Sequence, residues 1–207
     1  MVITALSLAV VAPTISAQSL SFGLRGSGNV PTGAFADNTT PGSANNALIT
    51  GAKSGFGYGL DVGVGLGAIG LYAGFDHVQF NCETATCTSN GQYRLQGVAV
   101  GAKLMVPGMD VFRPFVKGGV TFNNLKGNYG GSTSSTSFET DQTPGYEVGV
   151  GGDIALLGLV SLSPQIRYVG QNLKAKIPGV TTTGGNGSGV NFFSFSLGLS
   201  VHTPFGF

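Results

Sequence analysis

Residues 55–67, with the sequence GFGYGLDVGVGLG, alternate between two kinds of position. Every even position from Phe56 to Leu66 is apolar, and every odd position is glycine except Asp61. Strict alternation is typical of a β-strand whose two faces meet different surroundings, because successive side chains point to opposite faces. The stretch therefore predicts a strand with one apolar face and one nearly empty face that carries a single charge.

Similar alternation recurs along the chain, and no linker or shift in composition divides it. It predicts eight strands, at residues 19–33, 54–66, 69–80, 93–106, 113–126, 144–156, 161–174 and 190–203. Long polar connections follow every other strand, at 34–53, 81–92, 127–143 and 175–189, and short turns lie at 67–68, 107–112 and 157–160. Short turns at one end and long loops at the other are typical of outer-membrane barrels, in which the turns face the periplasm.

The polar face of these strands separates a membrane barrel from a soluble one, since a membrane barrel turns its apolar face outward to lipid. Eight charged residues occupy that face among Gly, Ala and Ser: Arg25, Asp61, Asp76, Lys103, Lys117, Glu147, Asp153 and Arg167. An eight-stranded barrel has room inside only for its own side chains, and charges buried there must pair.

The pattern therefore predicts an all-β fold, an eight-stranded antiparallel up-and-down transmembrane β-barrel. The eight charges are expected to form a network that plugs the lumen, with Asp61 paired to Arg25 or Lys103. The alternative is a soluble β-sandwich on which the same charges form exposed surface pairs.

Composition favours the membrane barrel over the sandwich. Charged residues make up 9% of the 207 residues, against about 25% in a typical soluble domain. Glycine, at 36 residues, is far above its usual share of about 7%. The formal net charge of +1 lacks the basic excess of a nucleic-acid-binding protein, so no nucleic-acid partner is expected.

The N-terminal residues have the apolar run and small residues of a secretory signal. We predict a signal peptide at 1–17, cleaved after Ala17, and a barrel at 18–207. No Lys or Arg precedes the apolar run, which departs from the usual signal. The alternative, a membrane helix, is disfavoured because the run ends at Pro13, short of the ~20 apolar residues that a spanning helix needs.

Few residues could carry chemistry. Export implies an oxidising compartment, so Cys82 and Cys87 are predicted to form a disulfide rather than a metal site. The phase of His77 directs it toward lipid or the interface, and His202 is expected to be a hydrogen-bonded lumen residue. The GxGxxG-like spacing within residues 63–70 lacks a following helix and the lysine of a phosphate loop. We therefore expect no enzyme, no cofactor and no metal.

Aromatic residues near the predicted strand ends fit the girdles found at the two membrane interfaces. They are Phe56, Tyr58, Phe80, Tyr93, Phe122, Tyr146 and Tyr168. Ordinary β-propensity would also explain any one of them alone.

Two segments and the last residue carry a family resemblance. RPFVKGGVTFNNL (113–125), GYEVGVGGDIALLGLVSLSPQIRYVG (145–170) and the final Phe207 resemble the small outer-membrane β-barrel superfamily, which includes the OmpA transmembrane domain, OmpX and opacity-type proteins. The resemblance implies a place in the outer membrane of a Gram-negative-type bacterium, among its lipid and lipopolysaccharide. It also implies that Phe205 and Phe207 form the signal read by the barrel-assembly machinery, with Thr203 and Pro204 departing from the pattern.

The long polar loops lead to the first functional hypothesis, a structural or surface-interaction protein whose four loops meet an unknown extracellular partner. The first alternative is a narrow porin-like channel for small solutes, which requires that the lumen charges leave a path. A lipid-modifying enzyme at the outer rim is the least favoured hypothesis. Deletion of 34–53 and 127–143 is expected to leave folding intact and to abolish partner binding.

Overall fold

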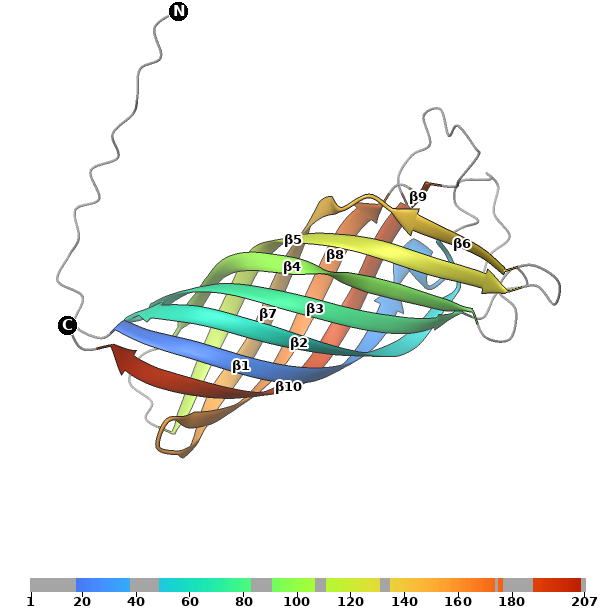
Figure 1. Ribbon diagram of the computed structural model, residues 1–207. Coiled ribbons are helices and arrows are strands. Elements are labelled where there is room, and N and C mark those ends of the chain that lie inside the picture. The colour runs from blue at the N-terminus through green and yellow to red at the C-terminus, as the bar shows by residue number, and fades with distance from the viewer. Residues whose placement is uncertain are drawn as a thin grey trace, which may run out of the picture.

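The computed structural model describes residues 18–37, 49–82, 91–106, 111–130, 135–173, 175–176 and 188–205. Eight of the strands in these residues form the barrel wall: β1 (Gln18–Thr32), β2 (Ala52–Leu66), β3 (Ile69–Cys82), β4 (Gln92–Met105), β5 (Phe112–Gly130), β7 (Thr143–Leu157), β8 (Val160–Leu173) and β10 (Ser188–Phe205). Each strand is antiparallel to its neighbours, and the pairings of β1 with β10 and of β4 with β5 close the ring. The predicted fold class is confirmed (Figure 1).

Two glycines form the tight connections at one end of the barrel. Gly67 lies between β2 and β3 with φ of 72°, and Gly158 lies between β7 and β8 with φ of 53°. Positive φ is costly for other residues, and it lets a two-residue turn follow the twist of a hairpin. We call this end, where β1 begins and β10 ends, the turn end, and the opposite end the loop end.

The loop end contains strands that the sequence did not predict. β6 (Ser135–Thr140) pairs with the far part of β5, and β9 (Ala175–Lys176) pairs with β6. A short 3-10 helix, η1 (Gly33–Phe35), follows β1. Reading 127–143 and 175–189 entirely as loops was therefore wrong, because β5 and β6 extend as a hairpin beyond the closed ring. No helix in the described part of the chain is long and apolar enough to cross a membrane.

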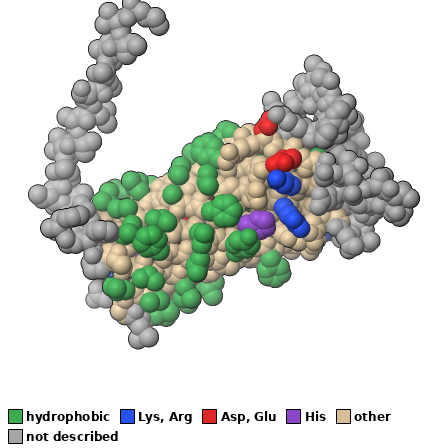
Figure 2. Space-filling model, viewed as in Figure 1, with side chains coloured by type: hydrophobic (Ala, Val, Ile, Leu, Met, Phe, Trp, Pro, Cys, Tyr) green, Lys and Arg blue, Asp and Glu red, His purple; other side chains and the backbone are tan. Residues whose placement is uncertain are grey.

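The outer surface is apolar over most of its length, as the alternation predicted. The even positions of β2 from Phe56 to Val64 are exposed, and so are Val116 and Val120 of β5. Figure 2 shows these apolar side chains spread over the barrel wall, with charged side chains gathered toward the loop end. Such a surface is compatible with lipid rather than water.

Inside the loop end, the pattern of polarity inverts. A buried apolar cluster fills the barrel there, formed by Phe35, Ile49, Ala52, Val78, Phe80, Tyr93, Leu95, Leu125, Phe138, Val169, Leu173, Val190 and Phe192. Phe35 of η1 packs edge-on against Phe80, with ring centroids 5.0 Å apart. Phe80 and Tyr93 are fully buried in this cluster, so their predicted place in an interfacial girdle was wrong. Phe56, Tyr58, Phe122 and Tyr146 are exposed on the outer face, and Tyr168 is half-buried there.

Several predictions fall on residues outside the described ranges. These are the signal peptide at 1–17, Cys87 and Phe207. The signal peptide, the disulfide between Cys82 and Cys87, and the assembly signal at Phe205 and Phe207 therefore stay predictions. Phe205 is paired with Gln18 at the end of β10.

Candidate functional site

The structure places all eight predicted charged residues inside the barrel, in two groups. Six of them form a continuous chain across the middle of the lumen: Asp61, Arg25, Asp76, Arg167, Glu147 and Lys117. The other two, Lys103 and Asp153, pair with each other closer to the turn end. Each side chain comes from the inward phase of its strand, and the two groups together join seven of the eight strands of the wall.

The chain of six is held by two arginines that share one carboxylate. Arg25 contacts both Asp61 and Asp76, and its distance to Asp76 is 2.8 Å. Arg167 donates to Asp76 from both terminal nitrogens, at 3.0 and 3.1 Å, and to Glu147 at 2.9 Å. Arg25 is thus the partner of Asp61, rather than Lys103. Bidentate pairing of this kind fixes orientation as well as charge balance.

Glu147 contacts three side chains of the network and its surroundings. It accepts hydrogen bonds from Arg167 and from the Tyr72 hydroxyl and pairs with Lys117 at 3.2 Å. The Lys117 ammonium also lies over the Tyr72 ring, 4.2 Å from its centroid. Glu147 and Arg167 are almost completely buried. A carboxylate in such a position is stable only because its oxygens are occupied by donors.

Glycine opposite the arginines makes room for them. A Cβ at Gly59 would lie 2.9 Å from the Arg25 guanidinium carbon, and one at Gly149 would lie 2.9 Å from the Arg167 Cγ. A Cβ at Gly23, by contrast, would find its nearest neighbour at 3.5 Å. Small residues are therefore required at particular points of the inner face, where the long cationic side chains cross the lumen.

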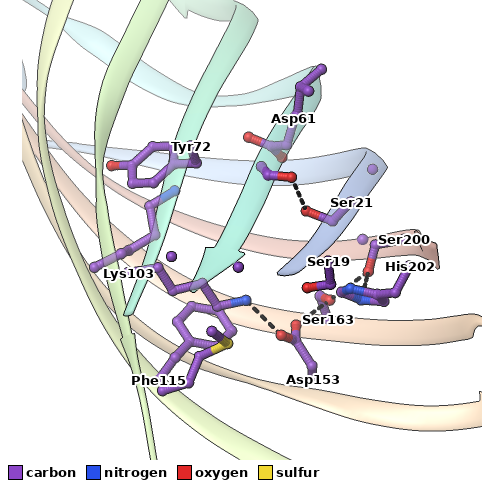
Figure 3. A pocket seen from close by; sticks show the side chains of 18 of the residues that line it. Ser19, Ser21, Asp61, Tyr72, Lys103, Phe115, Asp153, Ser163, Ser200 and His202 are labelled. Atoms are coloured by element: carbon purple, nitrogen blue, oxygen red, sulfur yellow. Dashed lines mark hydrogen bonds and ion pairs between the residues drawn. The ribbon is translucent and has the colours of Figure 1, made fainter. Parts of the chain in front are cut away.

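A cavity of ≈ 110 Å³ lies between the network and the turn end. Figure 3 shows the Lys103–Asp153 pair, Ser163, Ser200 and His202 around it. Asp153 also accepts a hydrogen bond from Ser163, at 2.6 Å. Most of the cavity lining is apolar, and hydroxyl and charged groups at Ser163, Ser200, Asp153 and Lys103 give ordered water its partners.

The two histidines lie where the sequence placed them. The His202 Nε2 atom lies 2.7 Å from the Ser161 hydroxyl and 3.1 Å from that of Ser200, inside the barrel. His77 faces outward and stacks on Tyr58, with ring centroids 5.0 Å apart. Within the described residues, no group of three or more His, Cys, Asp or Glu side chains could hold a metal ion.

On the loop side of the network, a layer of amides precedes the apolar cluster. The Asn123 amide nitrogen donates to Gln171 at 2.8 Å, and the Gln171 amide donates to the backbone carbonyl of Asn123 at 2.9 Å. The lumen therefore contains, from the turn end outward, the cavity, the charged network, the amide layer and the apolar cluster. These last two layers and Tyr72 were missed from the sequence, although the inward phase of Tyr72 and Phe80 was a usable signal.

A closed eight-stranded barrel with an apolar outer wall and a charged, filled lumen defines a small outer-membrane barrel. Residues 2–202 match the family described as outer membrane protein beta-barrel domain, and the chain belongs to that family. It is accordingly located in the outer membrane of a Gram-negative-type bacterium. The turn end is then periplasmic and the loop end extracellular.

Solved structures with the same fold differ widely from it in sequence. OprG of Pseudomonas aeruginosa has a TM-score of 0.55 at 12% identity, covering 91% of this chain and 96% of that one. Neisserial surface protein A has a TM-score of 0.54 at 14% identity, covering 89% and 96%. Ail, the attachment invasion locus protein of Yersinia pestis, has a TM-score of 0.51 at 13% identity, covering 91% and 99%. No curated protein matches the chain.

Proposed function

We propose that this protein is a non-conducting barrel that presents its extracellular segments to a partner at the cell surface. The observation that carries the proposal is the filled lumen, in which a charged network and an apolar cluster block the same path in series. A rigid, closed barrel of this kind is well suited to hold loops in place, and binding residues are often found on loops held by a rigid scaffold. The attachment protein Ail of Yersinia pestis has the same fold, which agrees with the proposal.

The two barriers, the charged network and the apolar cluster, differ in chemistry, so each would have to open in a different way for an ion to pass. Moving a hydrated ion past Arg167 and Glu147 requires that the buried pairs separate, and past Phe35 and Phe80 it requires that the apolar cluster open. Conduction through the narrow channel that we considered as an alternative would need both changes at once. That alternative is favoured only by the cavity of ≈ 110 Å³, which lies on the periplasmic side of both barriers.

We also infer that the protein is not an enzyme. A nucleophile needs a base that is oriented by a third group. His202 bonds Ser161 and Ser200, but within the described residues no carboxylate is hydrogen-bonded to its ring. Ser161 is itself buried, and Ser200, which lines the cavity, has the longer contact with His202, at 3.1 Å.

Loop replacement tests the proposal without disturbing the barrel. Deletion of all of 34–53 would remove Phe35 and Ile49 from the apolar cluster, so the smaller segments 39–47 and 83–90 are the better targets. Their flanks are already joined, because Gly51 donates to the Asp37 carbonyl at 3.0 Å and Cys82 to the Gly91 carbonyl at 3.0 Å. Short Gly–Ser linkers can therefore replace both segments, together with Cys82→Ser.

The assay measures the binding of cells that carry the protein to immobilised extracellular-matrix proteins and glycosaminoglycans. Binding should require the native segments, and a variant with the same segments in scrambled order serves as the matched control. Purified protein should give no steady single channels in a planar bilayer. Steady channels, or binding that survives both replacements, would overturn the proposal.

A further inference from the structure

The outward face of β3, β4 and β5 changes character in three steps toward the extracellular end. Three successive rows of cross-strand partners define these steps: Phe75, Val98 and Phe122; then His77, Gln96 and Asn124; then Gln79, Arg94 and Lys126. The first row is apolar, the second is polar, and the third contains two cations. The three rows therefore lead from the lipid-facing wall to the extracellular rim of the barrel.

Arg94 and Lys126 are direct partners in the register of β4 and β5. Arg94 is exposed, and about half of the Lys126 side chain is exposed. Like charges placed directly opposite each other on one face of a sheet destabilise it. An anion bound between the two side chains would remove that repulsion.

Among the described residues, one acidic side chain pairs with these two cations. Glu139 of β6 lies on the far side of Lys126, at 3.0 Å from its ammonium. On the near side, the described neighbours of Arg94 within one register step are amides, His77 and Lys126, and none is acidic. Figure 2 shows a histidine at the edge of the apolar wall with basic side chains beside it toward the loop end. Among the described residues, Arg94 thus has no acidic neighbour on the outer face of the wall.

The backbone of the pair lies just above the headgroup layer, and its long side chains can reach that layer. Two residues advance a strand by about 6.6 Å, and a tilt of about 40° reduces this to about 5 Å along the membrane normal. The row of Arg94 and Lys126 then lies about 10 Å above the last apolar row, and long cationic side chains reach back from it toward the lipid. The interfacial layer itself is about 5–8 Å deep.

The neighbouring groups are suited to a sugar as well as to a phosphate. Gln79 and Gln96 flank Arg94 and His77 with amide donors and acceptors. Tyr58 and His77 present a stacked pair of rings one row closer to the lipid than Arg94. Guanidinium and ammonium groups bind phosphate, whereas amides and flat rings are suited to hydroxyls and sugar faces.

We propose that Arg94 and Lys126 bind the phosphate of a phosphorylated glycolipid in the outer leaflet, with Gln79, Gln96 and the Tyr58–His77 stack contacting its sugar. The site lies on the lipid-facing wall, so it is independent of the extracellular segments and of the filled lumen. It would anchor one leaflet lipid at the β3–β4–β5 face.

The test uses the double variant Arg94→Gln/Lys126→Gln in phospholipid nanodiscs. Binding of phosphorylated lipopolysaccharide is measured by titration, and the same lipopolysaccharide after enzymatic dephosphorylation is measured in parallel. Arg113→Gln is the control for the loss of a cation away from the site, because Arg113 is an exposed arginine at the periplasmic end, on the inward phase of β5 and paired in register with Asp153. Heat-modifiable gel migration confirms that each variant is folded.

The double variant should bind phosphorylated lipopolysaccharide about 30-fold more weakly, the loss expected for two basic side chains at a lipid surface. Arg113→Gln should stay within about twofold of the native protein, and dephosphorylation should remove the difference between native and double variant. Equal binding by the native protein and the folded double variant overturns the proposal. A loss that persists with dephosphorylated lipid, or full competition by millimolar inorganic phosphate, overturns it as well, because the ligand would not be the glycolipid phosphate.

Discussion

Replacement of Glu147 by Gln tests whether charge pairing holds the lumen together. The change keeps the size of the side chain but removes the charge that Lys117 and Arg167 share, and it weakens the acceptor of the Tyr72 hydroxyl. Both cations are buried, so neither can recover its loss through water. Removing one partner from a buried pair costs about 3–5 kcal/mol, so the free energy of unfolding should fall by about 4 kcal/mol.

The measurement is urea unfolding in lipid vesicles. The chain contains no Trp, so the folded fraction is followed by heat-modifiable gel migration rather than by intrinsic fluorescence of that residue. With a slope of about 2 kcal/mol per molar urea, the midpoint should fall by about 2 M. Glu139→Gln is the control, because its ion pair with Lys126 is of similar length, at 3.0 Å, but exposed, and exposed pairs contribute about 0–1 kcal/mol.

A second substitution separates charge from packing. Adding Lys117→Met to Glu147→Gln removes the ammonium that has lost its partner, so part of the stability should return. Two results would refute the reasoning: a loss of less than about 1 kcal/mol for Glu147→Gln, or no recovery in the double variant. Either would mean that water reaches these groups and that the network is not truly buried.

Four further substitutions probe the outer wall, the inner glycines and the apolar cluster. Leu60→Arg places a charge in lipid at a cost of about 2–4 kcal/mol, and its folded band on unboiled gels should weaken; a native-like band would contradict the assignment of the outer face. Gly59→Ala should lower the free energy of unfolding by about 1–3 kcal/mol, because its Cβ would lie 2.8 Å from the Phe75 carbonyl oxygen and 2.9 Å from the Arg25 guanidinium carbon. Gly23→Ala, with more room, should leave the urea midpoint nearly unchanged, and equal effects would argue against steric selection. Phe35→Ala should cost about 3–5 kcal/mol in the same assay, and an unchanged midpoint would mean that η1 does not help to close the barrel.

Most strands of the barrel could be predicted from the sequence. Every strand must turn its apolar residues to lipid, so the same alternation of apolar and polar positions recurs in each. The predicted segment 54–66 became β2 over Ala52–Leu66, and 69–80 became β3 over Ile69–Cys82. The inward phase of all eight charges also follows from alternation alone. The ion pairs themselves cannot be deduced from alternation, because they depend on the stagger of the strands. Asp76, for example, pairs with Arg167, which lies 91 residues further along the chain.

The errors at the loop end have one physical cause. Above the lipid, the outer face of the barrel meets water and the inner face becomes a core. Within a single strand, apolar side chains therefore face outward in the lipid zone and inward above it. In β3, Phe75 faces outward in the lipid zone, whereas Val78 and Phe80 face inward above it. β6 was missed for a related reason, since its sequence STSFET has the Ser and Thr content of a loop.

The distribution of the eight lumen charges among the hairpins bears on how the barrel can assemble. The β1–β2 hairpin carries Arg25 and Asp61, and the β3–β4 hairpin carries Asp76 and Lys103, so each is neutral by itself. The other two hairpins are not: β5–β7 has Lys117 against two acids, and β8–β10 has Arg167 alone.

Counted over these eight charges, an assembly intermediate that contained only the first three hairpins would therefore carry one negative charge in excess, and Arg167 would be the residue that neutralises it. Insertion of the C-terminal half is thus energetically coupled to the arrival of the last hairpin. Closure of the ring and neutralisation of its interior become the same event, which favours an all-or-none final step.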